Sequence, residues 1–321
     1  MAMRVWALPK DPGAWPIWSK GIAAACDVSG PAEYRLLPTE RPQDAAFFAR
    51  NFAGASGLVW VRLGTVARDG IACDLDGFVA GALPTITRPF ILVTTDGDAT
   101  SPRDFWPPTV AALLGSPHLL AWYTQNHDGS CAPRVRPFPI GLDLHTSRLG
   151  WTTDRRLEVL SRLRERRRPA GAQPLRVFSD ADVTPNSADR RAAIVSLSGC
   201  RHVRKLYSRV GQGTIWRAYA SHPFVVSAHG NGLDCHRTWE VLLLGSIPIV
   251  RRSSLDPLYQ GLPVAIVDDW DEVRDLKRLA ALRAELAPLT AREHVWPRLT
   301  AAAWLAPLRA ELERASKPEA A

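Results

Sequence analysis

The residues best suited to chemistry lie together in one short segment, HGNGLDCHRTWE, which runs from His229 to Glu240. A run of apolar β-formers, PFVVSA, precedes it, and a run of apolar helix-formers, VLLLG, follows it. A strand, a tight glycine-rich turn and a helix in this order commonly hold a phosphate group at the N-terminus of the helix. The segment therefore predicts an anion-binding turn.

The flanking pattern predicts where each element begins and ends. We expect the strand to end near Ser227, the turn to span His229–Leu233 and the helix to run from about Asp234 to Leu244. Asp234 is expected to cap the helix, because a short acidic side chain accepts a free backbone N–H of the first turn. Gly245 is expected to close the helix.

Four residues of the segment point to a ligand. Gly230 and Gly232 permit positive φ and a close approach of the backbone to a bound group. Arg237 and Glu240 are three residues apart and share a helix face, which suits a cation beside a phosphate and a carboxylate beside a ribose diol. The alternative is a plain tight turn followed by a surface ion pair worth about 0.5 kcal/mol.

A metal site is the next hypothesis that this segment raises, since it holds five residues of ligand type: His229, Asp234, Cys235, His236 and Glu240. Cys235 and His236 are adjacent and diverge by about 100° around a helix, so they cannot face one ion. His236 and Glu240, at i and i+4, are the one pair placed to share an ion, and no HExxH pattern supports them. No metal site is predicted.

Outside this segment, short β-like runs alternate with helix-like segments. The runs are MRVWAL, EYRLL, GLVWVRL, PFILVTT, HLLAWYT and VRPFPI in a first series, and LRVFSD, HVRKLYS, PFVVSA, IPIVRR and VAIVDD in a second. Such alternation predicts parallel sheets covered by helices. We therefore predict an α/β fold of two Rossmann-like, doubly wound domains, residues 1–145 and 146–321, divided in the Gly-, Ser- and Thr-rich stretch Gly141–Thr153.

The C-terminal part of the second domain predicts helices and no site. From Asp271 onward we expect two helices, with a middle segment broken by Pro297 and Pro307. Their Leu and Ala stripes are typical of helices that cover a sheet or a domain junction.

The composition is that of a globular protein, with 46 % hydrophobic and 22 % charged residues among 321. No apolar stretch is long enough to cross a bilayer, and the N-terminal residues lack the features of a signal peptide. The five cysteines are scattered without a CxxC pair, so neither a disulfide framework nor a zinc ribbon is predicted. We expect a cytoplasmic protein with reduced thiols.

The net charge of +8 peaks in RRLEVLSRLRERRR, Arg155–Arg168, whose leucines recur at helical spacing. A solvated helix face is one interpretation of this basic helix. Peripheral contact with an anionic membrane, at its inner face, is the other. No helix-turn-helix, zinc-finger or RNP-type pattern accompanies the charge, so no nucleic-acid partner is expected.

Several motifs, taken together, resemble the exostosin family of glycosyltransferases. They are FVVSAHGNGLDCHRTWEVLLLGSIPIV followed by LPVAIVDDWDEV and, earlier in the chain, FILVTTDGD, WYTQN and PFPIGLD in that order. The resemblance covers roughly Pro89–Glu272 and is most specific from Phe224 to Val250. Unlike the animal members, this chain has no membrane anchor and no secretory cysteine pattern, which favours a bacterial-type enzyme that builds a surface polysaccharide or a glycolipid.

The resemblance implies a GT-B architecture, in which two Rossmann-like domains face each other across a cleft. It further implies inversion at the anomeric carbon, no obligatory metal or other cofactor, and a nucleotide-sugar donor, most simply a UDP-sugar, bound mainly by the C-terminal domain. Arg237 is then expected to meet the diphosphate, Glu240 the ribose, and the turn the phosphate or sugar. The residues of that turn are Ser227, His229, Gly230, Asn231, Gly232 and Asp234.

Inverting transfer needs a base for the acceptor hydroxyl and a positive group for the departing diphosphate. Arg237 and the helix N-terminus suit the second task. For the base we expect Asp96 or Asp98, which follow the run PFILVTT, because open α/β sheets present their chemistry at the carboxyl ends of strands. His127 and Asp143 are reserves. A turn built by the DGD sequence is the alternative for the first pair.

Other strand ends offer binding residues. Trp122 and Tyr123 are able to stack on a sugar ring, although aromatic residues there often belong to a core. Trp122, His127 and Asp143 are the predicted acceptor-binding residues, and Asp269, after the run VAIV, is a further donor-binding candidate.

Two other functional classes stay open. One is a non-catalytic module on the same fold that binds a nucleotide or carbohydrate. The other is an NADP-dependent oxidoreductase, in which Arg251 and Arg252 would meet the cofactor's extra phosphate. The GNGLDC sequence counts against the second class, because it supplies two glycines of a GxGxxG motif and puts Cys235 in place of the third.

Overall fold

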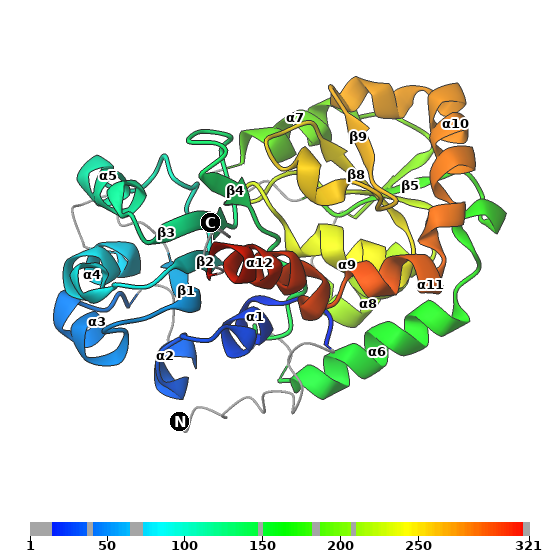
Figure 1. Cartoon of the computed structure of the whole chain (residues 1–321). Helices are drawn as coiled ribbons and strands as arrows, with labels where there is room; N and C mark the ends of the chain where they lie inside the picture. The colour runs from blue at the N-terminus through cyan, green and yellow to red at the C-terminus, as the bar shows by residue number, and fades with distance from the viewer. Residues whose placement is uncertain are drawn as a thin grey trace. The chain divides into compact units, whose positions relative to one another are not determined.

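A computed structural model of the chain describes residues 15–36, 41–64, 73–146, 150–181, 187–206 and 210–316. The chain divides into two compact units, unit 1 (Met1–Ile140 with Thr300–Ala321) and unit 2 (Gly141–Leu299). Each unit contains one parallel sheet with helices packed against it (Figure 1). The predicted α/β class, with two Rossmann-like parallel sheets and helices at the C-terminal end, is confirmed.

The sheet of unit 1 has the strand order β1-β2-β3-β4. The strands are β1 (Gly57–Gly64), β2 (Phe90–Gly97), β3 (Leu119–Thr124) and β4 (Val135–Pro137), and the α-helices are α1 (Ser19–Ala25), α2 (Ala32–Leu36), α3 (Ala45–Asn51), α4 (Asp74–Gly81), α5 (Pro107–Gly115) and α12 (Ala301–Ser316). Strands β1 and β2 are buried almost throughout, as expected for parallel strands covered on both faces.

One predicted strand of this unit is wrong, and another, MRVWAL, lies outside the described residues. The described part of EYRLL, Glu33 to Leu36, lies in helix α2, where Glu33 is in the first turn and Arg35 in the last, as the helix dipole favours. Tyr34 is buried between aromatic rings, and its hydroxyl accepts a hydrogen bond from the backbone N–H of Arg62 on β1 at 3.0 Å. Tertiary packing of this tyrosine therefore overrides the β-like composition of the run.

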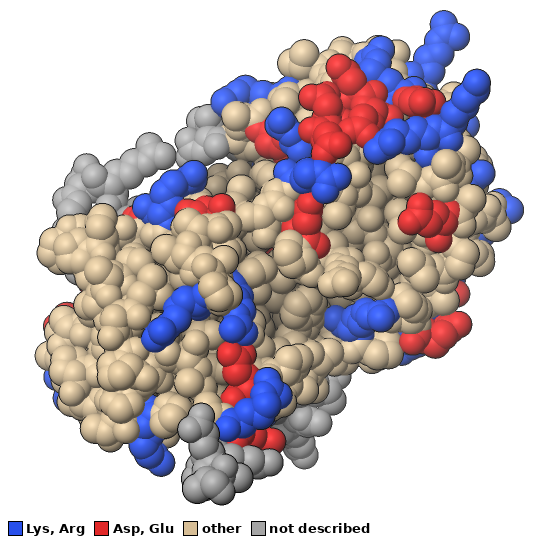
Figure 2. All heavy atoms as spheres, turned by 45° about the horizontal axis from the view of Figure 1, so that its top comes forward, with Lys and Arg blue, Asp and Glu red and all other residues tan. Residues whose placement is uncertain are grey.

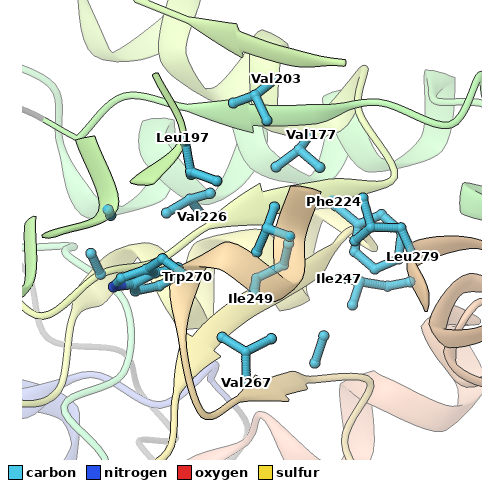
Figure 3. Close-up of a cluster of buried hydrophobic side chains, with 14 of the residues drawn as sticks. Val177, Leu197, Val203, Phe224, Val226, Ile247, Ile249, Val267, Trp270 and Leu279 are labelled. Atoms are coloured by element: carbon cyan, nitrogen blue, oxygen red, sulfur yellow. The ribbon is translucent and has the colours of Figure 1, made fainter. Parts of the chain in front are cut away.

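The sheet of unit 2 has the order β6-β5-β7-β8-β9. The strands are β5 (Val177–Ser179), β6 (Val203–Lys205), β7 (Phe224–Val226), β8 (Ile247–Arg251) and β9 (Ala265–Val267), and the α-helices are α6 (Thr153–Arg166), α7 (Ala188–Ser196), α8 (Gln212–Ala220), α9 (His236–Leu244), α10 (Leu276–Leu286) and α11 (Arg292–Val295). Every run of the second predicted series contains one of these strands. Figure 3 shows their core, a cluster of buried side chains that includes Val226, Ile249, Val267 and Trp270.

Short 3₁₀ helices complete both units. They are η2 (Leu83–Thr85), η4 (Ala170–Ala172), η5 (Asp256–Tyr259), η6 (Trp270–Arg274), η7 (Pro288–Thr290) and η8 (Trp296–Arg298).

Helix α12 belongs to unit 1, whereas the sequence-based division at residue 145 assigned it to the second domain. Its Glu311 carboxylate accepts hydrogen bonds from the Tyr123 hydroxyl at 3.1 Å and from Arg136 Nη1 at 2.9 Å. Pro307 lies inside this helix and does not break it. These contacts join residues nearly two hundred positions apart in the sequence, so no local pattern predicts them.

The predicted basic helix is confirmed as α6, but two arginines at its C-terminal end donate hydrogen bonds to backbone carbonyl groups inside unit 2. Arg167 donates to the carbonyl oxygens of Ala220 and Gly245, and Arg164 donates to those of Leu243 and Thr290. These carbonyl groups end helices α8 and α9 or lie just beyond a helix, where cations are stabilising.

Most of the other charge on and near α6 is solvent-exposed, whereas Arg156 is buried and pairs with Asp143. Arg155 and Arg162 pair with Glu158 of the same helix. Arg166 and Arg168 are exposed and are the arginines most open to an anionic surface. On the face drawn in Figure 2, basic and acidic side chains are interspersed. In the described part of the chain, no helix is long and apolar enough to span a membrane.

Replacing Arg167 by alanine is expected to lower the free energy of unfolding by about 1–3 kcal/mol, because buried carbonyl groups lose their donors. Arg166→Ala, one residue away and exposed, is the matched control and is expected to change it by less than about 0.5 kcal/mol. Urea unfolding followed by circular dichroism measures both. Equal stability of the two variants would contradict this role of Arg167.

Candidate functional site

The β7–α9 junction has the predicted order of strand, turn and helix, with the helix starting later than expected. Helix α9 begins at His236, and Cys235 is its N-cap residue without a side-chain cap. The predicted cap, Asp234, is wrong: its carboxylate accepts the backbone N–H of Cys235 at 2.9 Å and the indole N–H of Trp239 at 3.0 Å. Gly245 closes the helix with φ of 80°, as predicted.

The turn is held from outside by the N-terminus of α7. The backbone N–H of His229 donates to Asp189 Oδ2 at 2.9 Å, and its carbonyl oxygen accepts from Ser187 Oγ at 2.6 Å and Arg190 Nε at 3.2 Å. Burial lowers the pKa of the His229 imidazole, against the opposing charge of Asp189. The imidazole is therefore neutral at physiological pH.

The glycines of the turn do not have the role predicted for them. Among the described residues, those with positive φ include neither Gly230 nor Gly232. A Cβ on Gly230 would lie 2.9 Å from Arg190 Nη2, so this glycine permits the close approach of a side chain. Ser227 is also not open to a ligand, because its hydroxyl is buried and hydrogen-bonded to Thr238 Oγ1 at 2.8 Å. Asn231 is exposed at the turn.

Arg237 lies at the second position of α9 and contacts the end of a neighbouring strand. Its Nε is 2.8 Å from Asp180 Oδ1 and donates to the Tyr219 hydroxyl at 3.2 Å, and that hydroxyl donates to Asp180 Oδ2 at 2.7 Å. Asp180 directly follows β5, which pairs with β7, so the strand order brings the two segments together. This Arg237–Asp180–Tyr219 group is mostly buried.

The guanidinium of Arg237 is charged and incompletely satisfied. Burial lowers its pKa, but the Asp180 carboxylate and Tyr219 raise the pKa further, to a value above that of a free arginine. Its Nη1 is buried and has no hydrogen-bond partner among the described residues. A buried donor without an acceptor costs about 1–3 kcal/mol, which a bound anion would recover.

Glu240 lies one turn along the same helix and is 4 % exposed. Burial, and then the charge of Asp143, raise the pKa of its carboxyl group to about 8. Gln212 Nε2 donates to its Oε2 at 3.4 Å. At neutral pH this side chain is therefore mainly a carboxylic acid enclosed in unit 2, and not an open carboxylate.

Neither sequence interpretation of the Arg237 and Glu240 pair describes the structure fully. A surface ion pair is wrong, because both side chains are turned inward and no ion pair among the described residues joins them. The predicted contacts of Arg237 with a diphosphate and of Glu240 with a ribose stay a prediction, since Arg237 is paired with Asp180 and Glu240 is 4 % exposed. What the structure offers a ligand is the unpaired Nη1 of Arg237 near the start of α9.

Asp143 lies in a second polar group of unit 2. Its ligand atom and those of His145 and His236 all lie within 4.8 Å of one another. Burial raises the pKa of Asp143, but the charges of His236 and His145 and hydrogen bonds from Thr146 hold it well below its ordinary value. The sequence paired His236 with Glu240, whereas the fold places it with Asp143 and His145.

In unit 1, the two candidate bases differ in their surroundings. Asp96 is buried, forms an ion pair with Lys20 and has φ of 69°, and its backbone N–H donates to Gln125 Oε1 at 3.0 Å. Asp98, two residues later, is exposed. Asp98 is therefore the more accessible of the two candidate bases, since Asp96 is buried against Lys20.

The remaining predicted binding residues have structural partners. The prediction that Trp122 stacks on a sugar ring is wrong. Its side chain is 0 % exposed, and its indole N–H donates to Thr94 Oγ1 at 2.8 Å. His127 is buried with Nε2 donating to the Ser130 carbonyl at 2.9 Å. Asp269 caps η6 by accepting the backbone N–H of Asp271 at 2.8 Å.

Sequence reasoning missed four residues of these groups: Lys20, His145, Asp180 and Tyr219. Asp180 was open to prediction, since it ends the run LRVFSD in the way that Asp96 ends PFILVTT. The other three carry no comparable signal, because each lies in a helix or loop whose neighbours in space are distant in sequence.

Comparisons with known proteins give likenesses in structure alone. No protein-family model matches the chain, and no curated protein matches it. An α,α-trehalose-phosphate synthase (UDP-forming) from Burkholderia vietnamiensis superposes with a TM-score of 0.47 and 12 % identity over 86 % of this chain and 77 % of that chain.

Two further solved structures resemble the chain. The N-terminal domain of Candida albicans trehalose-6-phosphate phosphatase has a TM-score of 0.39 and 12 % identity over 78 % of this chain and 77 % of its own. A UDP-forming synthase of the same kind from Burkholderia xenovorans has a TM-score of 0.37 and 11 % identity over 80 % and 71 %. All three TM-scores lie below 0.5, so the function proposed below rests on the residues of unit 2 and not on these likenesses.

Proposed function

We propose that the chain is an inverting, exostosin-like glycosyltransferase that moves a sugar from a nucleotide diphosphate sugar to a hydroxyl group of a polysaccharide or glycolipid. The observation that carries this proposal is the unpaired Nη1 of Arg237, a buried cation near the start of helix α9. A diphosphate supplies the acceptor oxygens and negative charge that this position lacks.

The proposed reaction breaks the bond between the anomeric carbon and the diphosphate oxygen as the acceptor oxygen attacks from the opposite face. Negative charge develops on the departing diphosphate, and Arg237 with the N-terminus of α9 stabilises it. In this proposal the step needs no metal. Glu240, which is mainly protonated, has both a donor and an acceptor for the two ribose hydroxyls.

The acceptor hydroxyl loses its proton to a base, for which we propose Asp98 of unit 1. Asp98 is exposed, whereas Asp96 is buried and forms an ion pair with Lys20. A non-catalytic binding module is the second candidate function, and the burial of Glu240 and Asp96 favours it.

The oxidoreductase alternative has less support. Arg252 is paired with Asp256 and Asp268, and Arg251 is paired with Asp189, so both arginines proposed to meet an NADP phosphate already have carboxylate partners.

The proposal predicts that one of UDP, GDP, ADP and CDP raises the melting temperature of the chain, with UDP expected to act most strongly. Asp98→Asn is expected to keep that shift but to lower kcat by about 10²–10⁴, since it removes the general base. Asp104→Asn, another acidic residue of unit 1, is the control. No shift with any of the four nucleotides would refute the transferase, and a shift without turnover of any nucleotide sugar would select the binding module.

A further inference from the structure

Three side chains of metal-ligand type meet in unit 2, from two segments that are distant in sequence. Asp143 and His145 come from the segment 141–146, and His236 is the first residue of α9. One ligand atom from each lies within 4.8 Å of the other two, and His145 Nδ1 is 3.8 Å from Asp143 Oδ1. All three residues are half-buried, so a solvent ion has access to them.

The hydrogen bond of the His236 ring fixes a tautomer that suits a metal ligand. Its Nδ1 lies 2.8 Å from the carbonyl oxygen of Gly141 and must be the donor, because a carbonyl only accepts. In the neutral imidazole the proton is then on Nδ1, which leaves the lone pair of Nε2 for a ligand. A hydrogen bond from the second ring nitrogen to a backbone carbonyl is the usual support of a metal-bound histidine.

Hydrogen bonds also fix the position of the Asp143 side chain and backbone. The backbone N–H of Thr146 donates to its Oδ1 at 2.9 Å, and Arg156 Nη1 donates to its backbone carbonyl at 3.0 Å. Arg156 Nη1 also lies 3.5 Å from Oδ1, so both side-chain contacts fall on that oxygen and Oδ2 is the oxygen placed to bind an ion. The His145 and His236 rings meet edge to face with centroids 5.8 Å apart.

We propose that Asp143, His145 and His236 bind one divalent transition-metal cation of the Zn²⁺ type. Two imidazole nitrogens and one carboxylate oxygen suit Zn²⁺, Co²⁺ or Fe²⁺, whereas Mg²⁺ and Ca²⁺ prefer oxygen ligands alone. Ligand bonds of about 2.0–2.2 Å in a tetrahedral site place the ligand atoms about 3.4 Å apart, so side-chain rotation must shorten their separations by up to about 1.4 Å.

The ion would fasten the segment 141–146 to the start of α9. Because Arg237 is the next residue after His236, the metal fixes the helix turn that carries this arginine. This structural role is separate from the chemistry proposed above, in which the diphosphate is stabilised without a metal.

The test uses the full chain after removal of metal with EDTA and its exchange into metal-free buffer. Titration with Zn²⁺ by calorimetry, and with Co²⁺ by visible absorption, is expected to show one equivalent bound. His145→Ala and His236→Ala are each expected to weaken binding at least tenfold. His118→Ala, which removes an imidazole from unit 1, is the matched control and is expected to bind as the unchanged chain does.

Circular dichroism of each variant in EDTA shows whether it is folded, and Asp143→Asn serves as a third, milder variant. Absence of Zn²⁺ and Co²⁺ binding by the unchanged chain would overturn the proposal. Undiminished binding by the folded variants would overturn it as well, and would direct attention to Cys200 and His202, whose side chains lie 3.3 Å apart. The nucleotide experiments are done in EDTA and again with Zn²⁺ restored, so a failure of the proposed function is distinguished from an effect of the missing metal.

Discussion

The double variant Asp180→Asn/Arg237→Gln is expected to fold and to lose all stabilisation by nucleoside diphosphates. It removes both charges of the buried pair at once, so neither is left unpaired in unit 2. The Tyr219 hydroxyl keeps neutral partners of similar size on both sides. Without the guanidinium, the developing charge of the departing diphosphate has lost its main counter-charge, and kcat/KM is expected to fall about 10²–10³-fold or more.

Comparing the double variant with the single variant Arg237→Ala separates the effect on nucleotide binding from the effect on stability. The single variant leaves the Asp180 carboxylate buried without its cation, which is expected to cost about 3–5 kcal/mol of stability. The double variant is therefore expected to be more stable than the single one, while both fail to respond to nucleotide. Differential scanning fluorimetry with and without UDP, and turnover of the UDP-sugar, measure these outcomes.

Arg251→Gln is a matched control, because Arg251 also pairs with a carboxylate of unit 2 but lies outside the Arg237–Asp180–Tyr219 group. It is expected to keep the nucleotide response. If the double variant responds to UDP as the unchanged chain does, Arg237 does not bind the diphosphate and the proposed function loses its main support.

Glu240→Gln is expected to make the protein more stable, and by an amount that grows with pH. The folded pKa of Glu240 is about 8, whereas a glutamate in an unfolded chain has a pKa of about 4.3. Between these values the folded state holds a proton that the unfolded state has released, so stability falls as pH rises from about 4 to about 8. Glutamine is neutral in both states and escapes this loss.

The expected gain of Glu240→Gln is near zero at pH 4 and about 5 kcal/mol at pH 8. Urea unfolding at a series of pH values measures it, with Glu285→Gln on the exposed face of α10 as the control that shows no such trend. A gain that is constant between pH 4 and pH 8 would contradict the raised pKa.

Substitutions of Glu240 also test whether its buried carboxyl group contacts the ribose of a bound nucleotide. If Glu240 contacts the ribose, Glu240→Gln keeps one donor and one acceptor and weakens nucleotide binding moderately, whereas Glu240→Ala removes both and is expected to lose most of the nucleotide-induced shift. A stable Glu240→Ala variant with an unchanged response to UDP would make Glu240 a packing residue of unit 2.

Local patterns in the sequence were enough for most of the secondary structure that bears on the site. Apolar runs of five to seven residues between turn residues predicted all five strands of unit 2, and the runs from GLVWVRL onward predicted those of unit 1. Gly245 was identified as the end of α9 from one position, because a glycine after an apolar helix run favours the left-handed conformation found there. These features depend on neighbours a few residues away.

Only the tertiary structure decided which side chains meet. Arg237 was known to be on a helix face, but its partner Asp180 follows β5, and β5 lies beside β7 only because of the strand order of the folded sheet. The grouping of His236 with Asp143 and His145, and the placement of α12 in unit 1, have the same origin. Periodicity records which face of an element is apolar, whereas an ion pair or a metal ligand set depends on which elements pack together, and that information is spread over the whole chain.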